Sequence, residues 1–407
     1  MKALLRVGRC YKGVVEIPTM EIGQTEYEEK YPDEPITLKR IKTLDNGCEI
    51  VVPNYLSPTS IAKAYEDPEE FFNTYLSISP PDRFPQTFQM MFGSAFDGAV
   101  KNFLQTKLLG ENNVPEEFQY ERIIKDQCER HFWDKEHPMY LSEHDAFYWA
   151  EYLLNAYKTS GALQDLLIEL KEASEAPRFE FTVTNEIKMK TDESGVVLLG
   201  KPDVYFKTKN GNQVIYDWKC NGIYSKSNTS PKPQFMRCRD GWLSVPKEGY
   251  TGPIASHSRS HMSRHKDAMP FKHKGMTING ASSFHLIDKT WSAQLCTYGW
   301  LMGEHIGSDF VLGIDQLCGA PGEYMKPKVR VASHRSIVKE SWQIEFYNKA
   351  KELWTCLQNG HAFVGLSREE SDDMVAEMYS IYGNHEKGSK EEWLANSMRA
   401  PKYGHNK

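Results

Sequence analysis

Three residues near the middle of the chain have the types and spacing of a site for a hard metal ion. Asp203 is followed fourteen positions later by Asp217, and Lys219 lies two residues further on. Two carboxylates can hold a divalent cation through oxygen, and such an ion activates water and neutralises charge growing on a phosphate. A neighbouring lysine can orient the attacking water or help to deprotonate it, or stabilise the phosphate charge. These residue types together predict metal-assisted hydrolysis at phosphorus.

The segment between the two aspartates predicts a β-hairpin, because two β-rich runs flank the turn pair Asn210-Gly211. Side chains alternate between the faces of a strand, so the length of the turn decides whether the three groups share a face. A two-residue turn at Asn210-Gly211 pairs Asp203 with Trp218 and leaves Asp217 on the opposite face. That register does not suit a shared metal ion.

We therefore predict a loop of odd length. A three-residue loop from Asn210 to Asn212, with a bulged glycine position, sets Asp203 opposite Lys219 and Tyr205 opposite Asp217. All three polar groups then face one way. Taken singly, either aspartate also suits a solvated strand end, where a carboxylate caps a turn or pairs with a lysine.

The hairpin residues resemble the signature of the PD-(D/E)XK nucleases. Pro202-Asp203 and Asp217-Trp218-Lys219 match its two halves, and Gly200-Lys201 matches the common lead-in. The resemblance implies that Asp203, Asp217 and Lys219 are the catalytic residues. It implies DNA as the substrate and Mg²⁺ as the cofactor, with Mn²⁺ as a substitute.

A second motif is Gln294-Leu295-Cys296-Thr297-Tyr298, which resembles the QxxxY helix motif of RecB-like and phage recombination exonucleases within that superfamily. Gln294 and Tyr298 are four residues apart and share one helix face. The resemblance implies that they contact DNA or brace the catalytic lysine. The alternative is a buried helix in which the tyrosine hydroxyl is merely satisfied.

Upstream, the segment from Gly93 to Asp97 occupies the place where these families carry GxxxH, and Asp97 replaces the histidine. Aspartate is also a good ligand for Mg²⁺ or Mn²⁺, so the resemblance keeps Asp97 as a metal ligand with a harder preference. The alternative is a polar residue beside the apolar stripe of a helix.

The family often supplies a glutamate before the first motif strand, and Glu175, Glu180 and Glu186 are equal candidates. Some RecB-like relatives hold an iron-sulfur cluster on closely spaced cysteines. Cys318 and Cys356 do not fit that pattern, so we expect no cluster.

The pattern along the chain predicts the elements that position these residues. Helical patterns cover 56–77, 86–110, 115–175, 290–307 and 341–360, and strand patterns cover 179–190, 196–209, 213–219, 309–317 and 328–338. We expect an α/β fold with a restriction-endonuclease-like core, in which a small central mixed sheet is flanked by helices. The expected organisation is an N-terminal extension 1–54, a nuclease domain 55–366 with an insertion 221–285, and a charged C-terminal tail 367–407.

The formal charge is −6, so contact with nucleic acid requires a local basic groove. The predicted insertion offers one, because His257, His261 and His265 recur every four residues among arginines and a lysine. A basic loop that contacts phosphates and an insertion without catalytic consequence suit this segment about equally. A zinc site on a helix face is less favoured, because the context is serine-rich.

Several features favour a reducing compartment. The eight cysteines form no close pairs, and only three apolar residues lie between Lys2 and Arg6. No run approaches the ~18 apolar residues of a membrane span. We expect a cytoplasmic protein without membrane association, in the host cytoplasm if the chain is phage-encoded.

The expected function is a metal-dependent deoxyribonuclease, an exonuclease in DNA recombination or repair. Expected partners are DNA and a single-strand annealing or other recombination protein, and an oligomer is possible. One alternative is a structure-specific or defence-type endonuclease. Another is a DNA-binding or assembly module that keeps the fold and does not cleave.

Overall fold

The computed structural model describes residues 9–10, 13–14, 40–78, 88–119, 143–221, 243–244, 271–273, 276–278, 289–320 and 328–382. Every structural statement below concerns these residues. His257, His261 and His265 lie outside them, as does most of the predicted insertion.

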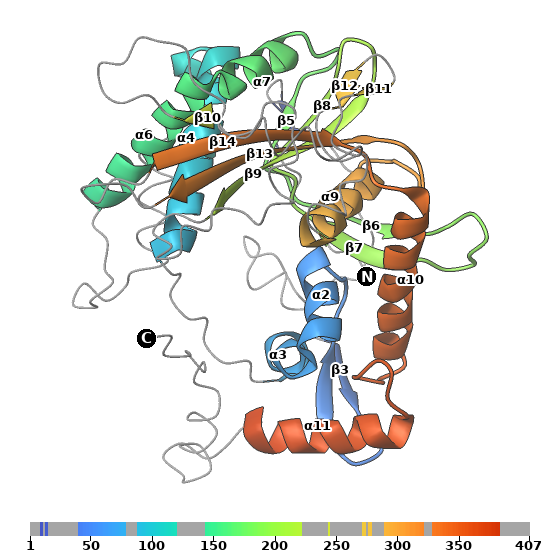
Figure 1. Cartoon of the computed structure of the whole chain (residues 1–407). Helices are drawn as coiled ribbons and strands as arrows, with labels where there is room; N and C mark the ends of the chain where they lie inside the picture. The colour runs from blue at the N-terminus through green and yellow to red at the C-terminus, as the bar shows by residue number, and fades with distance from the viewer. Residues whose placement is uncertain are drawn as a thin grey trace.

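A mixed β-sheet runs through the molecule (Figure 1). Its strand order is β10-β14-β13-β9-β8-β5-β1-β2. The strands are β10 (Leu243–Ser244), β14 (Lys328–Ser336), β13 (Val311–Ala320), β9 (Gln213–Asn221), β8 (Val204–Lys207), β5 (Arg178–Phe179), β1 (Arg9–Cys10) and β2 (Gly13–Val14). β13 and β9 are parallel, whereas the other neighbours in this sheet are antiparallel.

Helices cover both faces of the sheet, because β8 and β9 are apolar on each side. α4 (Phe88–Leu109), α6 (Glu143–Ser160) and α7 (Ala162–Lys171) pack on one face, where Phe206 and Tyr216 are buried among their side chains. α9 (Lys289–Leu301) packs on the other face, which presents Tyr205 and Ile215. This burial on both sides explains why the two strands read as continuous apolar runs.

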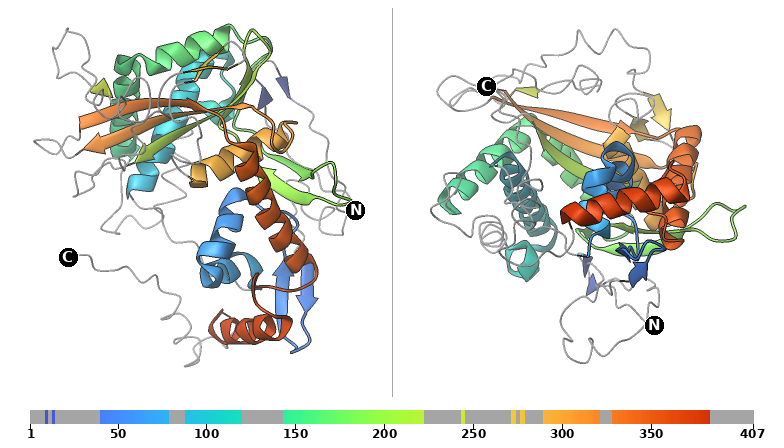
Figure 2. Two further views of the ribbon diagram at one scale, coloured as in Figure 1. Left: turned by 45° about the vertical axis from the view of Figure 1, so that its right-hand side comes forward. Right: turned by 90° about the horizontal axis from the view of Figure 1, so that it is seen from below.

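Elements from residues 40–76 and 340–382 lie together in a second region, drawn in blue and red (Figures 1 and 2). It contains β3 (Arg40–Thr43), β4 (Glu49–Val52), α2 (Pro58–Glu66), α3 (Pro68–Phe71), the π-helical turn Phe72–Leu76, α10 (Glu340–Gln358) and α11 (Arg368–Tyr382). The strands β6 (Val183–Ile187) and β7 (Val196–Gly200) form a hairpin beside it. Short elements elsewhere are Glu111–Asn113, Glu116–Phe118, β11 (Phe271–His273) and β12 (Met276–Ile278).

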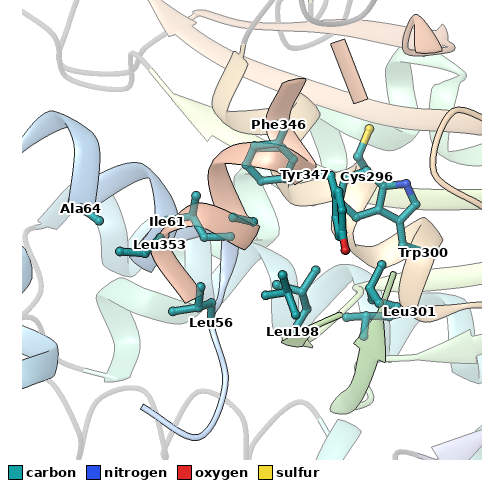
Figure 3. Packing of buried hydrophobic residues seen from close by; sticks show 14 of the residues in the cluster. Leu56, Ile61, Ala64, Leu198, Cys296, Trp300, Leu301, Phe346, Tyr347 and Leu353 are labelled. Atoms are coloured by element: carbon teal, nitrogen blue, oxygen red, sulfur yellow. The ribbon is translucent and has the colours of Figure 1, made fainter. Parts of the chain in front are cut away.

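Apolar side chains from α2, β7, α9 and α10 converge between these regions (Figure 3). Leu56, Leu198 and Trp300 are buried there. Gln343, also buried, accepts hydrogen bonds from Trp300 Nε1 at 3.1 Å and from the Gly307 backbone N–H at 2.9 Å. α10 is therefore fixed against α9, the helix that carries Gln294 and Tyr298.

The expected α/β class with a mixed sheet flanked by helices is confirmed. α11 lies in the segment that we expected to be a charged tail. It buries Val375 and Met378 in the same apolar cluster, because its apolar residues recur on one face of an otherwise acidic helix. Among the described helices, none is both long and apolar enough to cross a lipid bilayer.

Candidate active site

The turn between β8 and β9 sets the register of the candidate site. The Thr208 backbone N–H donates to the Asn212 carbonyl at 2.9 Å, and the Gly211 N–H donates to the Thr208 carbonyl at 2.8 Å. Gly211 has φ +80°, a left-handed conformation that costs glycine little. The turn is thus a three-residue loop, Lys209 to Gly211, with the glycine in its last position.

The predicted odd length of the loop is confirmed, but its predicted position was wrong by one residue. Gly211, and not Asn212, takes the left-handed position, because a residue without Cβ adopts it more easily. The ladder pairs Val204 with Tyr216. Continued by one residue, this register sets Asp203 opposite Asp217, and not opposite Lys219 as predicted. The shift of two residues preserves the common face of the three groups.

On this face, Asp217 and Lys219 form a charged pair. Lys219 Nζ lies 2.5 Å from Asp217 Oδ2 and 2.9 Å from Gln294 Oε1. The Asp217 side chain is 3% exposed and that of Lys219 is 21% exposed, so the ammonium is the more accessible partner. Gln294 Nε2 donates to Tyr298 OH at 3.0 Å. α9 therefore braces the lysine through Gln294.

The two facing aspartates differ in their affinity for a proton. Burial raises the pKa of Asp217 well above its ordinary value, and Asp203 raises it further, against the opposing effect of Lys219. Burial alone would raise the pKa of Asp203, but Lys101, a hydrogen bond with Asp217 and Lys219 bring it below its ordinary value. The surroundings of the pair therefore favour a proton on Asp217 over a proton on Asp203.

A second lysine, which the sequence did not point to, fills the space beside Asp203. Lys101 Nζ lies 2.5 Å from Asp97 Oδ2, 3.0 Å from Asp203 Oδ1 and 3.1 Å from Glu180 Oε2. Its side chain is 1% exposed. Burial alone would lower its pKa, but the three carboxylates raise it well above the ordinary value, so the ammonium is charged.

Helix α4 brings Asp97 and Lys101 to the sheet. The two residues are four apart and share one face of the helix. One turn earlier, Gly93 lies against β9, where an added Cβ would stand 4.0 Å from Cys220 Cβ. One feature of the sequence could have identified Lys101. It is a lysine on an apolar helix face, four residues after Asp97, and this spacing allows an ion pair.

Of the three candidate glutamates, Glu180 is the one that faces the acids. Glu175 pairs with Lys207 at 2.7 Å, and Glu186 accepts a hydrogen bond from the Gly195 N–H. Glu180 also pairs with Lys201, and its backbone N–H donates to the Asp203 carbonyl at 2.9 Å. Its φ of +42° is unusual for a residue with a side chain, and such strain is often found at functional sites.

The opposite face of β9 anchors the strand that carries Asp217 and Lys219. Trp218 points away from Asp217 and Lys219, and its Nε1 donates to Tyr157 OH at 3.2 Å. The Tyr157 hydroxyl in turn donates to Asp315, which lies opposite Trp218 in the parallel ladder with β13. This buried chain of hydrogen bonds fixes the strand between α6 and the sheet.

The donor set suits a hard divalent ion, because carboxylate oxygens are the ligands that Mg²⁺ and Mn²⁺ prefer. Asp97 Oδ1 is buried and has no hydrogen-bond partner, so it is an oxygen available to a cation. Within the described residues, no three His, Cys, Asp or Glu side chains are grouped as a ready-made metal site. Lysine ammonium groups stand between the acids instead.

A comparison with models of known protein families finds no match for the chain, and no curated protein matches its sequence. The resemblance of the motifs to the PD-(D/E)XK nucleases stays a prediction.

Proposed function

We propose that this protein is a metal-dependent deoxyribonuclease with a restriction-endonuclease-like core. The observation that supports the proposal most is the common face of Asp203, Asp217 and Lys219 at the end of the β8–β9 hairpin. Two carboxylates and one braced ammonium at a partly open strand end suit phosphodiester hydrolysis better than a purely structural ion pair. A structural pair would not need Gln294 to hold the lysine from another element.

In the proposed reaction, Asp203 and Asp217 hold a divalent ion, and Asp97 offers its unpaired Oδ1. When bound, such an ion supplies an activated water and neutralises charge on the phosphate. Lys219 points its ammonium toward the attacking water or the phosphate oxygens, and Gln294 limits its motion. A bound ion would favour the ionised form of Asp217, whose pKa is raised by burial, because metal ligands must be deprotonated.

We propose that the substrate is a DNA end, digested progressively in recombination or repair. This choice depends on the resemblance of Gln294 and Tyr298 to the QxxxY motif. The hydrogen bonds from Lys219 to Gln294 and from Gln294 to Tyr298 support the bracing role over a purely DNA-contacting role. A single-strand annealing protein is a suitable partner for such an enzyme, and Mg²⁺ or Mn²⁺ a suitable cofactor.

The test uses the purified full chain with end-labelled single-stranded and double-stranded linear DNA, and with covalently closed circular DNA. We expect loss of label from linear DNA in Mg²⁺ or Mn²⁺ and none with EDTA. Asp217→Asn should remove the activity, whereas Asp373→Asn, at an exposed position of α11, should keep it.

Other outcomes identify the alternative functions. Cleavage of closed circles at a rate similar to that of linear DNA would favour a structure-specific or defence-type endonuclease. DNA binding without cleavage in either metal would contradict the proposal and favour a non-cleaving module.

A further inference from the structure

Lys101 has the surroundings that a metal ion has in many phosphate-processing sites. Oxygens of three carboxylates, from Asp97, Glu180 and Asp203, lie 2.5 to 3.1 Å from its Nζ. These acids come from a helix, from the residue after β5 and from the residue before β8. The ammonium thus joins three elements of the candidate site through charge-assisted hydrogen bonds.

The burial of Lys101 indicates that its ammonium group stays in the site and does not leave it when another cation binds. Its side chain is 1% exposed, and the neighbours Ala99, Val100 and Leu104 on α4 are buried in the apolar core. If the ammonium left, Asp97 and Asp203 would lose their ion-pair partner, and Glu180 would keep only its pair with Lys201. Breaking a buried ion pair in this way is strongly unfavourable.

We propose that Lys101 is a built-in cation that takes the place of a second metal ion, so that the site binds a single divalent ion on the Asp203–Asp217 side. This inference rests on the proposed metal-dependent function. It assigns a positioning role to Lys101, which acts through the carboxylates that it holds.

The distribution of oxygens supports one ion. Asp97 and Asp203 each give one oxygen to Lys101, and Asp217 gives one to Lys219. The second oxygen of Asp97 is buried and unpaired, and that of Asp203 accepts a long hydrogen bond from the Trp218 backbone N–H at 3.5 Å. Few carboxylate oxygens therefore remain, which suits one hard cation that completes its shell with water and a phosphate oxygen.

The formal charges also support one ion. Ion pairs form two sets in the site: Lys101 and Lys201 with Asp97, Glu180 and Asp203, and Lys219 with Asp217. Together these groups carry a charge of −1 when all are ionised. One divalent ion and one phosphodiester group bring the total to zero. A second divalent ion would leave a charge of +2 in a largely buried site, which costs free energy.

The experiment is a titration of the metal-free full chain with Mn²⁺, in which electron paramagnetic resonance counts the bound ions. No DNA is present, so the count does not depend on cleavage. We expect one Mn²⁺ per wild-type chain. Lys101→Met removes the charge and keeps most of the stem, and we expect this variant to bind two. Lys107→Met, at an exposed position of the same helix, should bind one.

The outcomes separate this inference from the proposed function. Two Mn²⁺ ions per wild-type chain would overturn the inference and leave the nuclease proposal intact. One ion in folded Lys101→Met would overturn it as well. If circular dichroism shows that Lys101→Met does not fold, the number of Mn²⁺ ions bound per wild-type chain tests the inference by itself. Binding of no Mn²⁺ by the wild type would contradict both proposals.

Discussion

At the scale of single residues, two lysines divide the acidic groups of the site between them. Lys219 forms an ion pair with Asp217, and Lys101 forms ion pairs with Asp97 and Asp203. Lys219 is the more exposed of the two and has a neutral partner in Gln294. If Asp217 bound a metal ion, as proposed, the hydrogen bond to the Gln294 amide oxygen would still hold the Lys219 ammonium in place. Gln294 is therefore the residue on which the alignment of Lys219 depends.

We predict that Gln294→Leu lowers the rate of DNA cleavage by about 10–100-fold, the range typical of residues that orient a catalytic group. The variant loses the acceptor 2.9 Å from Lys219 Nζ. Thr290→Ala, at an exposed position of the same helix, is the matched control and should retain the wild-type rate. Wild-type rates for Gln294→Leu would show that Lys219 needs no brace.

The sequence predicted Asp203, Asp217, Lys219 and Gln294 because their spacing is local, within a hairpin or a helix turn. It did not predict Lys101, because a lysine in a helix is usually solvated. The burial of Lys101 follows from α4 packing against β9, which no local pattern specifies. It also left Glu180 unranked, because the turn of the backbone at φ +42° directs this side chain.

At the scale of elements, α9 packs closely against β7 behind the site. A Cβ at Gly200 would lie 2.6 Å from Tyr298 Cδ1 and 2.8 Å from Leu301 Cδ1. Any side chain at this position pushes on Tyr298, and through it on Gln294. The glycine of the Gly200-Lys201 lead-in thus has a packing role in placing the helix.

We predict that Gly200→Ala lowers the free energy of unfolding by about 1–3 kcal/mol, the usual cost of overpacking. Gly93→Ala should act in the opposite direction. Its Cβ meets only Cys220 Cβ at 4.0 Å, and alanine favours a helix interior over glycine by about 0.5–1 kcal/mol. Urea denaturation of both variants measures the two effects. A stable Gly200→Ala protein would contradict the close packing of α9 on β7.

In the β8–β9 hairpin, local sequence patterns predicted the loop length but not the strand register. Alternation of side chains and the need for a common face predicted an odd loop, and the loop is odd. The exact partner of Asp203 depended on which loop residue adopts a positive φ. Gly211 does so at lower cost than Asn212, and this preference moved the register by two residues.

At the scale of the whole molecule, the buried acids link stability to pH. Burial, opposed by Lys101 and supported by the charges of Asp203 and Glu180, raises the pKa of Asp97 to about 7. An unfolded aspartate titrates near pH ~3.9. Between these values the folded chain binds more protons than the unfolded chain, so stability falls as pH rises. Asp203 and Glu180 have lowered pKa values, so their contribution to stability has the opposite sign and is lost as pH falls.

We predict that the Tm of the wild type in EDTA falls between pH 5 and 8, and that Mg²⁺ raises Tm more at pH 8 than at pH 5. Ionised acids bind the cation, and binding to the folded state stabilises it. Asp97→Asn should reduce the fall, because the amide does not titrate. Thermal unfolding followed by circular dichroism measures this. Equal slopes for both proteins would exclude Asp97 as a source of the pH dependence.

The arrangement of the whole chain was the least predictable from sequence. Helix and strand types followed from periodicity, but the parallel pairing of β9 with β13 joins segments almost a hundred residues apart. Lys42 near the start of the described chain donates to the Asn359 carbonyl after α10. Such contacts depend on the packing of complete elements, which local propensity does not determine.

The most direct test of the catalytic claim is cleavage of linear DNA in Mg²⁺ by wild type, Lys219→Ala and Lys209→Ala. Lys209 lies on the exposed hairpin loop and pairs with Glu172, so its replacement is the control. We predict wild-type rates for Lys209→Ala. For Lys219→Ala we predict a loss of about 10²–10⁴-fold with DNA binding retained. Unchanged digestion by Lys219→Ala, or a wild type that binds DNA and Mg²⁺ without cleaving, would contradict the account.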